Sequence, residues 1–500
     1  MGLWNKIMNF FRYGGETVTT LNTFIDHPKI AVTEEEYSRI LNNLKYYKSS
    51  FDDVKFLNSD GDAHTRKFHH LPIGRTACKK IASLVFNEQA EFKIDDEGAN
   101  EFINQVLKND RFNKNFERYL ESALALGGMA MRPYVDGKDI KVAFIQAPVF
   151  LPLQSNTQDV SSAAIIMRSV KSEGSKQKYY SLIEFHEWQE DSYIVTNELY
   201  KSDTEDRVGE RVPLSELYEG LKDEVPLSKL SRPLFTYLKT PGMNNKNINS
   251  PLGLSLFDNA KSTIDFLNRT FDEFTWEVRM GQRRVAVPEQ TVKTVVDHFG
   301  NQKVLRKHFD PDQNVFVQIG GGDIDKQIGI TDLTTPIRSE SYIQAINEGL
   351  SLFEMQIGVS AGMFTFDGKS MKTATEVVSE NSDTYQMRNS IVSLVEHSLK
   401  ELIISICELG SLYGLYHGTI PNFDDISINL DDGVFTDKSK ELEYWSQMVA
   451  SGFASSKTAI MKLHGVTEEK ALEMLNEIKT EMVQQSNSIR SEEDIDVYGE

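Results

Sequence analysis

Residues 249–280 read NSPLGLSLFDNAKSTIDFLNRTFDEFTWEVRM and decide the fold of this chain. Ser250 and Pro251 predict the start of a helix, because a serine oxygen caps free N–H groups and proline lacks the N–H that would go unpaired there. Apolar residues then recur every three or four positions, which places them on one side of the helix. They are Phe257, Ala260, Ile264, Leu267, Phe271, Phe274 and Val278. The stretch is predicted to bury this stripe against a partner.

A second helix with a matching stripe is predicted from about Thr335 and Pro336 onward. Its apolar residues are Ile343, Ile346, Leu350, Phe353 and Ile357. Two such helices can pack antiparallel as a hairpin. The intervening segment, residues 282–334, is too long for a turn. It contains runs of β-branched residues that are interrupted by glycine and proline. We therefore expect a small β-containing insert at the far end of the hairpin.

Composition bounds the class of protein. The chain has 500 residues and a formal charge of −20, and 40% of it is apolar, so about two to four domains with sizeable cores are expected. No apolar run approaches the roughly 18 residues of a membrane span. A protein that grips DNA phosphates normally presents a net basic footprint, so any role with nucleic acid must be a non-gripping one.

The two cysteines and the N-terminus give further expectations. Cys78 and Cys407 lie in apolar helical patterns and are predicted to be buried small hydrophobes, which suits a reducing cytoplasm. Met1 to Arg12 is amphipathic but lacks the cleavage site of a signal peptide. Docking of this segment against another subunit or domain is favoured over membrane-surface binding.

The remaining chain predicts an α+β protein. Helices are expected in the first part at 34–47, 73–86 and twice within 98–127, and antiparallel strands between Met129 and Leu238. A capping box of Thr373 and Glu376 starts a helix that persists to about Gly410, on the order of 55 Å long. A short strand at 426–430 and helices at 437–450, 457–464 and 468–483 complete the prediction.

The sequence contains only weak matches to motifs for nucleotide binding, metal binding or catalysis. Residues 362–370, GMFTFDGKS, resemble a phosphate-binding P-loop, but five residues separate the glycines where the motif has four, and a helix precedes the loop where a strand is required. His64, His69 and His70 cluster without a companion cysteine, so surface or packing roles are favoured over zinc. No nucleophile motif or distinctive carboxylate pair is present, and we expect no enzyme, cofactor, metal or catalytic residue.

One local charge contrast stands out between residues 279 and 307. This segment is basic in an otherwise acidic chain, and its cations are Arg279, Arg283, Arg284, Lys293, Lys303, Arg306 and Lys307. A solvated face and a docking surface for an acidic partner or a neighbouring subunit are both open interpretations.

The order of these elements resembles one family. The chain combines an α+β body with a helix opened by NSPLG at 249–253 and a β insert. These are followed by KTATEV at 372–377, which heads a long helix, and by DGVFTD at 432–437 before another helix. The chain resembles the portal proteins of tailed bacteriophages, particularly those of phages that infect Gram-positive bacteria. The similarity covers nearly the whole chain.

The resemblance implies a ring, usually a dodecamer, at one capsid vertex, through which DNA is packaged and the genome is ejected. It implies double-stranded DNA passing without sequence specificity, terminase, a head–tail adaptor and the major capsid and scaffolding proteins as partners, with no membrane. The protein would be located in the virion, and in the host cytoplasm during assembly. A non-channel coiled-coil scaffold or other structural virion protein is an alternative, and a P-loop ATPase is the least favoured one.

The resemblance also implies a division of the chain. Residues 1–241 and the long helix at 373–414 would form the wing, and residues 242–281 and 335–358 would form the stem. Residues 282–334 would form the clip, and residues 359–372 would form the tunnel loop. Residues 415–485 would form an α-helical crown, followed by an acidic disordered tail at 486–500.

Candidate functional residues follow from this division. Lys369 and Lys372 would face DNA in the tunnel loop, and a row of acidic residues at Asp258, Asp265 and Asp272 is a candidate channel lining. Candidates for partner docking on the clip are Arg283, Arg284, Lys303, Arg306 and Lys307. Candidates for stem packing are Phe257, Ile264, Leu267, Phe271, Phe274, Ile346, Leu350 and Phe353.

Overall fold

The computed structural model forms two compact units, one comprising Met1–Met371 and Ser379–Asp431, the other Lys372–Val378 and Asp432–Glu500. It describes residues 20–57, 61–86, 90–155, 159–174, 176–189, 192–281, 285–288, 316–319, 331–332, 334–364, 382–430, 438–464, 466 and 470–480. Helices and strands are mixed along the chain, which confirms the predicted α+β class.

The N-terminal helices lie where the sequence predicts them. They are α2 (Glu34–Tyr47), α3 (Ile73–Val85), α4 (Glu97–Asn109) and α5 (Phe112–Leu126), with the short 3₁₀ helix η1 (Phe24–Asp26) ahead of them. Side chains cap two of them: Thr33 accepts a hydrogen bond from the Glu36 N–H at 3.3 Å, and Asp96 accepts one from Ala99 at 2.7 Å. Helix α5 ends at Gly127, whose left-handed φ of 97° favours glycine.

The two largest sheets in the described part of the body are antiparallel. The described residues of the larger sheet run in the order β1-β11-β10-β9-β8-β7, with β12 also on β10. Its strands are β1 (Thr20–Leu21), β7 (Phe150–Ser155), β8 (Val160–Glu173), β9 (Lys176–Gln189), β10 (Ser192–Ser202), β11 (Gly209–Val212) and β12 (Glu224–Leu227). The smaller sheet has the order β13-β5-β6, from Thr236–Lys239, Gly128–Asp136 and Asp139–Gln146. The 3₁₀ helices η2 (Ala147–Val149) and η3 (Leu214–Glu216) flank these strands.

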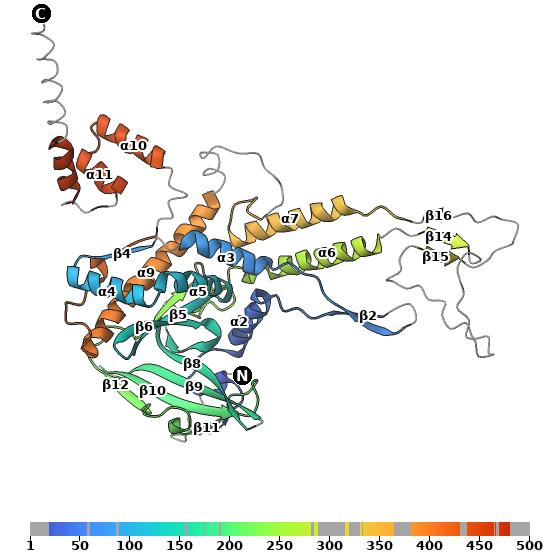
Figure 1. Ribbon diagram of the computed structural model, residues 1–500, viewed down its shortest axis with the longest axis horizontal. Coiled ribbons are helices and arrows are strands. Elements are labelled where there is room, and N and C mark those ends of the chain that lie inside the picture. Colours follow the sequence, from blue (N-terminus) through green and yellow to red (C-terminus); the bar gives the residue numbers. More distant parts are fainter. Residues whose placement is uncertain are drawn as a thin grey trace, which may run out of the picture. The chain divides into compact units, whose positions relative to one another are not determined.

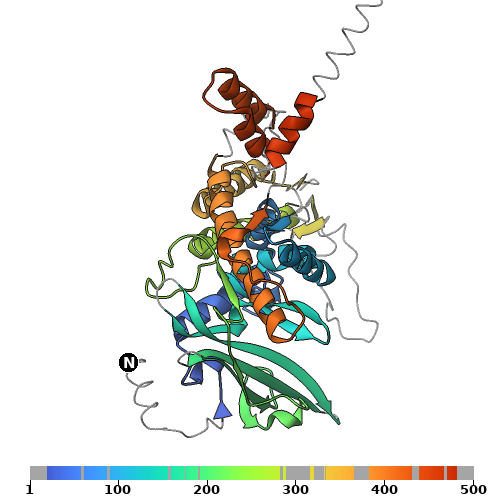
Figure 2. The same cartoon turned by 90° about the vertical axis from the view of Figure 1, so that its left-hand side faces the viewer.

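The long helix α9 (Ser382–Leu412) crosses this body and packs against β5, β13 and α3 (Figures 1 and 2). Its predicted capping box lies outside the described residues, but its C-terminal end agrees with the sequence prediction. The described helix is about 46 Å long. Both cysteines are fully buried, Cys407 on α9 and Cys78 on α3, as predicted.

The chain returns to the body after α9. Strand β17 (Ile426–Asn429), preceded by η6 (Phe423–Asp425), pairs antiparallel with β4 (Glu91–Ile94), so that Ile426 faces Ile94. Residues 415–430 therefore belong to the first compact unit, and the division of the chain into wing and crown stays a prediction.

The described part of the second unit is helical. It contains α10 (Lys438–Ala450), α11 (Ser456–His464) and a helical stretch at 470–480, close to the three predicted helices. Ser455 caps α11 by accepting a hydrogen bond from the Thr458 N–H at 3.1 Å. Across the described residues of both units, none of the helices combines the length and hydropathy of a membrane span.

The start of the first hairpin helix differs from the prediction. Helix α6 begins at Lys261, after the 3₁₀ turn η4 (Asp258–Ala260), and Ser250 does not cap it. The Ser250 hydroxyl instead accepts a hydrogen bond from the Leu252 N–H at 3.2 Å. Gly253 then lies so close to the body that an added Cβ would be 2.2 Å from the Gly127 carbonyl oxygen. The chain thus packs against the body here before the helix begins.

Candidate functional site

Helices α6 (Lys261–Met280) and α7 (Ser339–Ile357) form an antiparallel hairpin that stands out from the body (Figure 1). Contacts along its length fix the register. Near the body, the Thr263 hydroxyl donates to Gln356 Oε1 at 2.7 Å. Farther out, the Phe274 and Tyr342 rings stack with centroids 5.3 Å apart. Beyond them, Arg338 donates to both carboxylate oxygens of Glu277, at 3.1 and 2.9 Å.

A glycine of α7, Gly349, lies directly against side chains of α6. An added Cβ at Gly349 would lie 2.7 Å from the side chain of Leu267 and 3.0 Å from the Phe266 ring. Any larger residue would separate the helices or displace these side chains. The hairpin is therefore a packed pair with a defined register.

The predicted stem stripe is buried near the body and open farther out. Phe257, Ile264, Leu267, Ile346, Leu350 and Phe353 are buried, and Phe271 and Phe274 are half-buried. By contrast, Val278 is 46% exposed and Ile343 is 48% exposed. The inner part of the stripe thus builds the core of one copy, while the outer part keeps exposed apolar side chains at Val278 and Ile343.

The acidic row, which begins at Asp258 in η4 and continues with Asp265 and Asp272 on α6, has a different role from the expected one. The buried carboxylate of Asp258 accepts hydrogen bonds from Arg39 at 2.8 Å, Asn43 at 3.0 Å and Lys261 at 2.7 Å. Burial alone would raise its pKa, but the hydrogen bonds from Lys261 and Asn43 hold the pKa below its usual value. Asp258 therefore attaches the start of the hairpin to α2.

Asp272 is also buried, and it binds both terminal nitrogens of Arg66, each at 2.7 Å. It accepts a third bond from the His69 N–H at 3.0 Å. Burial opposes its ionisation, yet the bonds from Arg66 and His69 lower its pKa. This carboxylate ties the middle of α6 to the segment before α3.

Asp265, between them, accepts hydrogen bonds from the Tyr46 hydroxyl at 2.9 and 3.0 Å. Burial together with this carboxylate raises the pKa of Tyr46 to about 12. The prediction that the row lines a channel is therefore wrong for Asp258 and Asp272, because both are buried against their own chain. The three carboxylates form a seam, which we call the carboxylate seam, between α6 and the N-terminal part of the body.

The insert between the two helices contains β structure where it is described. Strands β14 (Val285–Pro288), β15 (Phe316–Ile319) and β16 (Thr331–Asp332) form a sheet in the order β15-β14-β16, with β14 parallel to β15 and antiparallel to β16. The predicted docking residues Arg283, Arg284, Lys303, Arg306 and Lys307 lie outside the described residues, so their role stays a prediction.

The segment after α7 is anchored at its base. The buried carboxylate of Glu354 accepts hydrogen bonds from the N–H groups of Gly362 and Phe364. Two reciprocal hydrogen bonds join Ser360 and Thr384. The Ser360 N–H donates to the Thr384 hydroxyl at 3.0 Å, and the Thr384 N–H donates to the Ser360 hydroxyl at 3.3 Å. The start of this segment is thereby joined to the start of α9. Lys369 and Lys372 lie outside the described residues.

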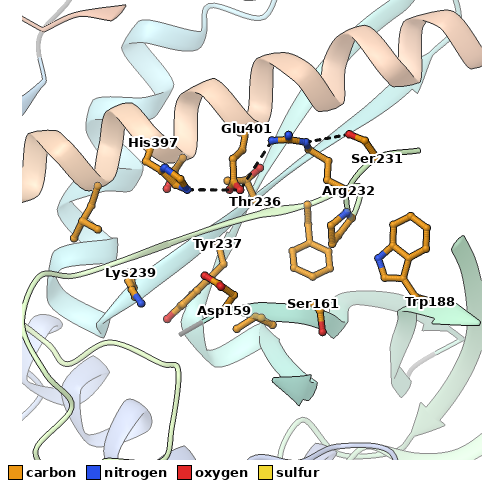
Figure 3. A pocket seen from close by; sticks show the side chains of 15 residues that line it. Asp159, Ser161, Trp188, Ser231, Arg232, Thr236, Tyr237, Lys239, His397 and Glu401 are labelled. Atoms are coloured by element: carbon orange, nitrogen blue, oxygen red, sulfur yellow. Dashed lines mark hydrogen bonds and ion pairs between the residues drawn. The ribbon is translucent and has the colours of Figure 1, made fainter. Parts of the chain in front are cut away.

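A cleft of about 300 Å³ lies between α9, β13 and the start of β8 (Figure 3). Glu401 of α9 lies between His397 and Arg232 in this cleft, with its Oε1 3.7 Å from His397 Nε2 and 4.0 Å from Arg232 Nη1. Burial raises the pKa of Glu401, although His397 and Arg232 act in the opposite direction. Mixed charges over aromatic walls give this cleft no clear preference for one ligand charge.

Sequence reasoning missed the partners of the carboxylate seam and the hairpin β2–β3 (Val54–Leu57 and Ala63–Arg66). The strand-like run VKFL followed by NSDG at 58–61 is a hairpin signal and could have revealed it. Nothing local in the sequence connects Arg39, Tyr46 or Arg66 with their partners in η4 and α6.

Comparison with protein families places the chain among the portal proteins of bacteriophages. Residues 26–487 match the model of the family described as phage portal protein, SPP1 Gp6-like, and the chain belongs to this family. The resemblance found in the sequence is thus confirmed. A search of curated proteins gives no significant match.

Proposed function

We propose that copies of this chain assemble into a ring, with a dodecamer as the expected form, that serves as the channel for DNA at one capsid vertex. The family match over residues 26–487 carries this proposal. It is supported by the hairpin, whose outer part leaves Val278 and Ile343 exposed in a single copy. Neighbouring hairpins that pack side by side would cover such apolar surface.

The charge of the chain suits passage of DNA. Each copy carries −20 formally, so a ring repels phosphates and does not hold them by counterion release. Lys369 and Lys372 are proposed to make weak, transient contacts with passing DNA, in a loop that connects the stem to the long helix. Because Asp258 and Asp272 are buried, they are not proposed to contact DNA.

The partners are proposed from the same family membership. Terminase during packaging and a head–tail adaptor afterwards would dock on the insert, residues 282–334, through its basic side chains. The outer body would meet the major capsid and scaffolding proteins, in the host cytoplasm during assembly and in the virion afterwards. The described part of the second unit is proposed to belong to the crown.

The decisive experiment measures the oligomer and its passage of DNA. Light scattering after size-exclusion chromatography, with negative-stain images, should show closed rings with a central hole. In an in vitro packaging assay, rings that carry Lys369→Ala and Lys372→Ala should assemble normally but alter the amount of DNA packaged or retained. Monomers or open filaments at micromolar concentration would contradict the channel and favour a different structural role in the virion.

A further inference from the structure

The chain crosses between its two compact units three times, after Met371, after Val378 and after Asp431. Three described segments of the first unit precede or follow these points along the sequence: the segment after α7, the start of α9 and the residue after β17. Hydrogen bonds tie both of the other segments to the start of α9. The parts of the first unit from which the chain leaves and to which it returns therefore share one junction.

Arg388, in the second turn of α9, bonds the end of β17. Its Nη2 donates to the Leu430 carbonyl oxygen at 2.8 Å, and its Nε donates to the Leu84 carbonyl oxygen at 2.7 Å. Leu84 lies in the last turn of α3, where carbonyl groups lack partners within the helix. One half-buried guanidinium thus joins the ends of α3 and β17 to α9.

The base of the segment after α7 is bonded to the same two helices. On α9, Thr384 shares two hydrogen bonds with Ser360. Thr384 lies four residues before Arg388, so both residues are on one side of the helix, one turn apart. On α3, Lys80 donates to the Met363 carbonyl oxygen at 2.7 Å, also one turn before the carbonyl group that accepts from Arg388. The two attachments are therefore adjacent on both helices.

Adjacent attachments on one helix favour a shared opening. The first two turns of α9 move as one piece as long as their own backbone hydrogen bonds persist. A displacement of these turns away from α3 breaks the bonds to Ser360 and to Leu430 in the same event, because Thr384 and Arg388 move together. Local openings of this kind involve contiguous parts of a structure and occur without global unfolding.

We propose that the first two turns of α9 couple the base of the segment after α7 to the end of β17, with Arg388 as the linking residue. Loosening either attachment then loosens the other, since coupling between two sites acts in both directions. The coupling connects points next to the crossings between the units. It acts within one chain and goes beyond the proposed function, so its failure would leave the ring and the channel untouched.

Hydrogen exchange of the full chain tests the coupling by changing one attachment and measuring the other. Arg388→Ala removes the bonds to Leu430 and Leu84, and exchange of the Ser360 amide should become about tenfold faster or more. Ser360→Ala removes the hydroxyl that accepts from the Thr384 N–H, and exchange in β17 should rise in turn. Light scattering of the same samples reports the oligomer separately.

A matched control and a double variant complete the design. Ser390→Ala changes an exposed residue of α9 whose hydroxyl donates to Gln386 of the same helix at 2.9 Å, and it should alter neither readout. Ser360→Ala combined with Arg388→Ala should speed exchange by less than the product of the single effects, because the second substitution acts on a junction that is already loosened.

The outcomes decide between coupled and independent attachments. Faster exchange at the distant attachment in both single variants, with the smaller combined effect in the double variant, supports the coupling. If each substitution speeds exchange only beside itself, the attachments are independent and the coupling is overturned. If Arg388→Ala speeds exchange throughout the first unit, Ser360→Ala decides, and unchanged exchange of β17 in that variant overturns the coupling.

Discussion

Asp272 and Arg66 form a two-bond ion pair across 206 residues of sequence, with both N–O distances at 2.7 Å. The carboxylate is buried, and Arg66 is the residue at which the hairpin β2–β3 meets α6. One pair thus connects the stem helix to the hairpin base. Losing either member leaves a charge without its partner in a poorly solvated position.

Arg66→Ala is therefore expected to lower the free energy of unfolding by about 3 kcal/mol, because it leaves Asp272 buried and unpaired. Urea unfolding followed by circular dichroism measures this change. As a control, Lys45→Ala removes the exposed pair of Lys45 with Asp52 at 3.6 Å and should cost less than about 1 kcal/mol. Equal effects of the two substitutions would contradict the role of Asp272 in the carboxylate seam.

The same pair predicts a pH dependence of stability. The pKa of Asp272 is lower in the folded chain than its ordinary value of 3.8, so the folded state binds its proton less readily than the unfolded state. The stabilisation is fully present above the ordinary pKa and is lost as pH falls through the lowered pKa of the folded state. In Asp272→Asn, unfolding free energy should fall less steeply below about pH 4. An identical slope in both proteins would refute this linkage.

Much of the fold could be predicted from local patterns. Helix α2 lies at Glu34–Tyr47 as predicted, because its periodicity and the Thr33 cap are both local signals. The start of α6 could not be predicted, since Ser250 and Pro251 match the local pattern of a helix start, whereas Gly253 packs against Gly127, which is distant in the sequence.

The acidic row of Asp258, Asp265 and Asp272 shows how far the candidate functional site could be predicted from the sequence. The seven-residue spacing of Asp265 and Asp272 places them on one side of α6, and Asp258 lies in the turn η4 just before it, but spacing does not say what these side chains face. Their partners Arg39, Tyr46 and Arg66 come from a part of the sequence more than 200 residues away. Long-range polar contacts of this kind carry no periodic signal.

The stem stripe predicts two separable effects. Leu267→Asp places a charge in the core of a single copy, where desolvation costs several kcal/mol, and should unfold the hairpin. Val278→Asp changes a residue that is exposed in one copy and should keep the melting temperature while weakening assembly. Light scattering and thermal melts distinguish these results. Val170→Asp, on an exposed position of β8, is the matched control and should assemble normally.

The base of the loop after α7 gives the last prediction. Glu354 is fully buried and its two carboxylate oxygens accept from Gly362 and Phe364. Glu354→Gln keeps the shape but turns an NH₂ group toward one of these N–H groups, so one hydrogen bond is lost and a buried donor stays unpaired. This costs about 1–3 kcal/mol. Local opening should then be about tenfold or more frequent, measured as faster hydrogen exchange of the Gly362 and Phe364 amides.

Glu348→Gln on the same helix is exposed and should leave this exchange unchanged. Because Ser360 and Thr384 still join the segment to α9, faster exchange should be confined to the residues that Glu354 holds. If Glu354→Gln exchanges at the rate of the unsubstituted protein, the carboxylate does not anchor the loop, and the bonds between Ser360 and Thr384 must hold its base. If exchange rises throughout α7, the carboxylate supports the hairpin as a whole.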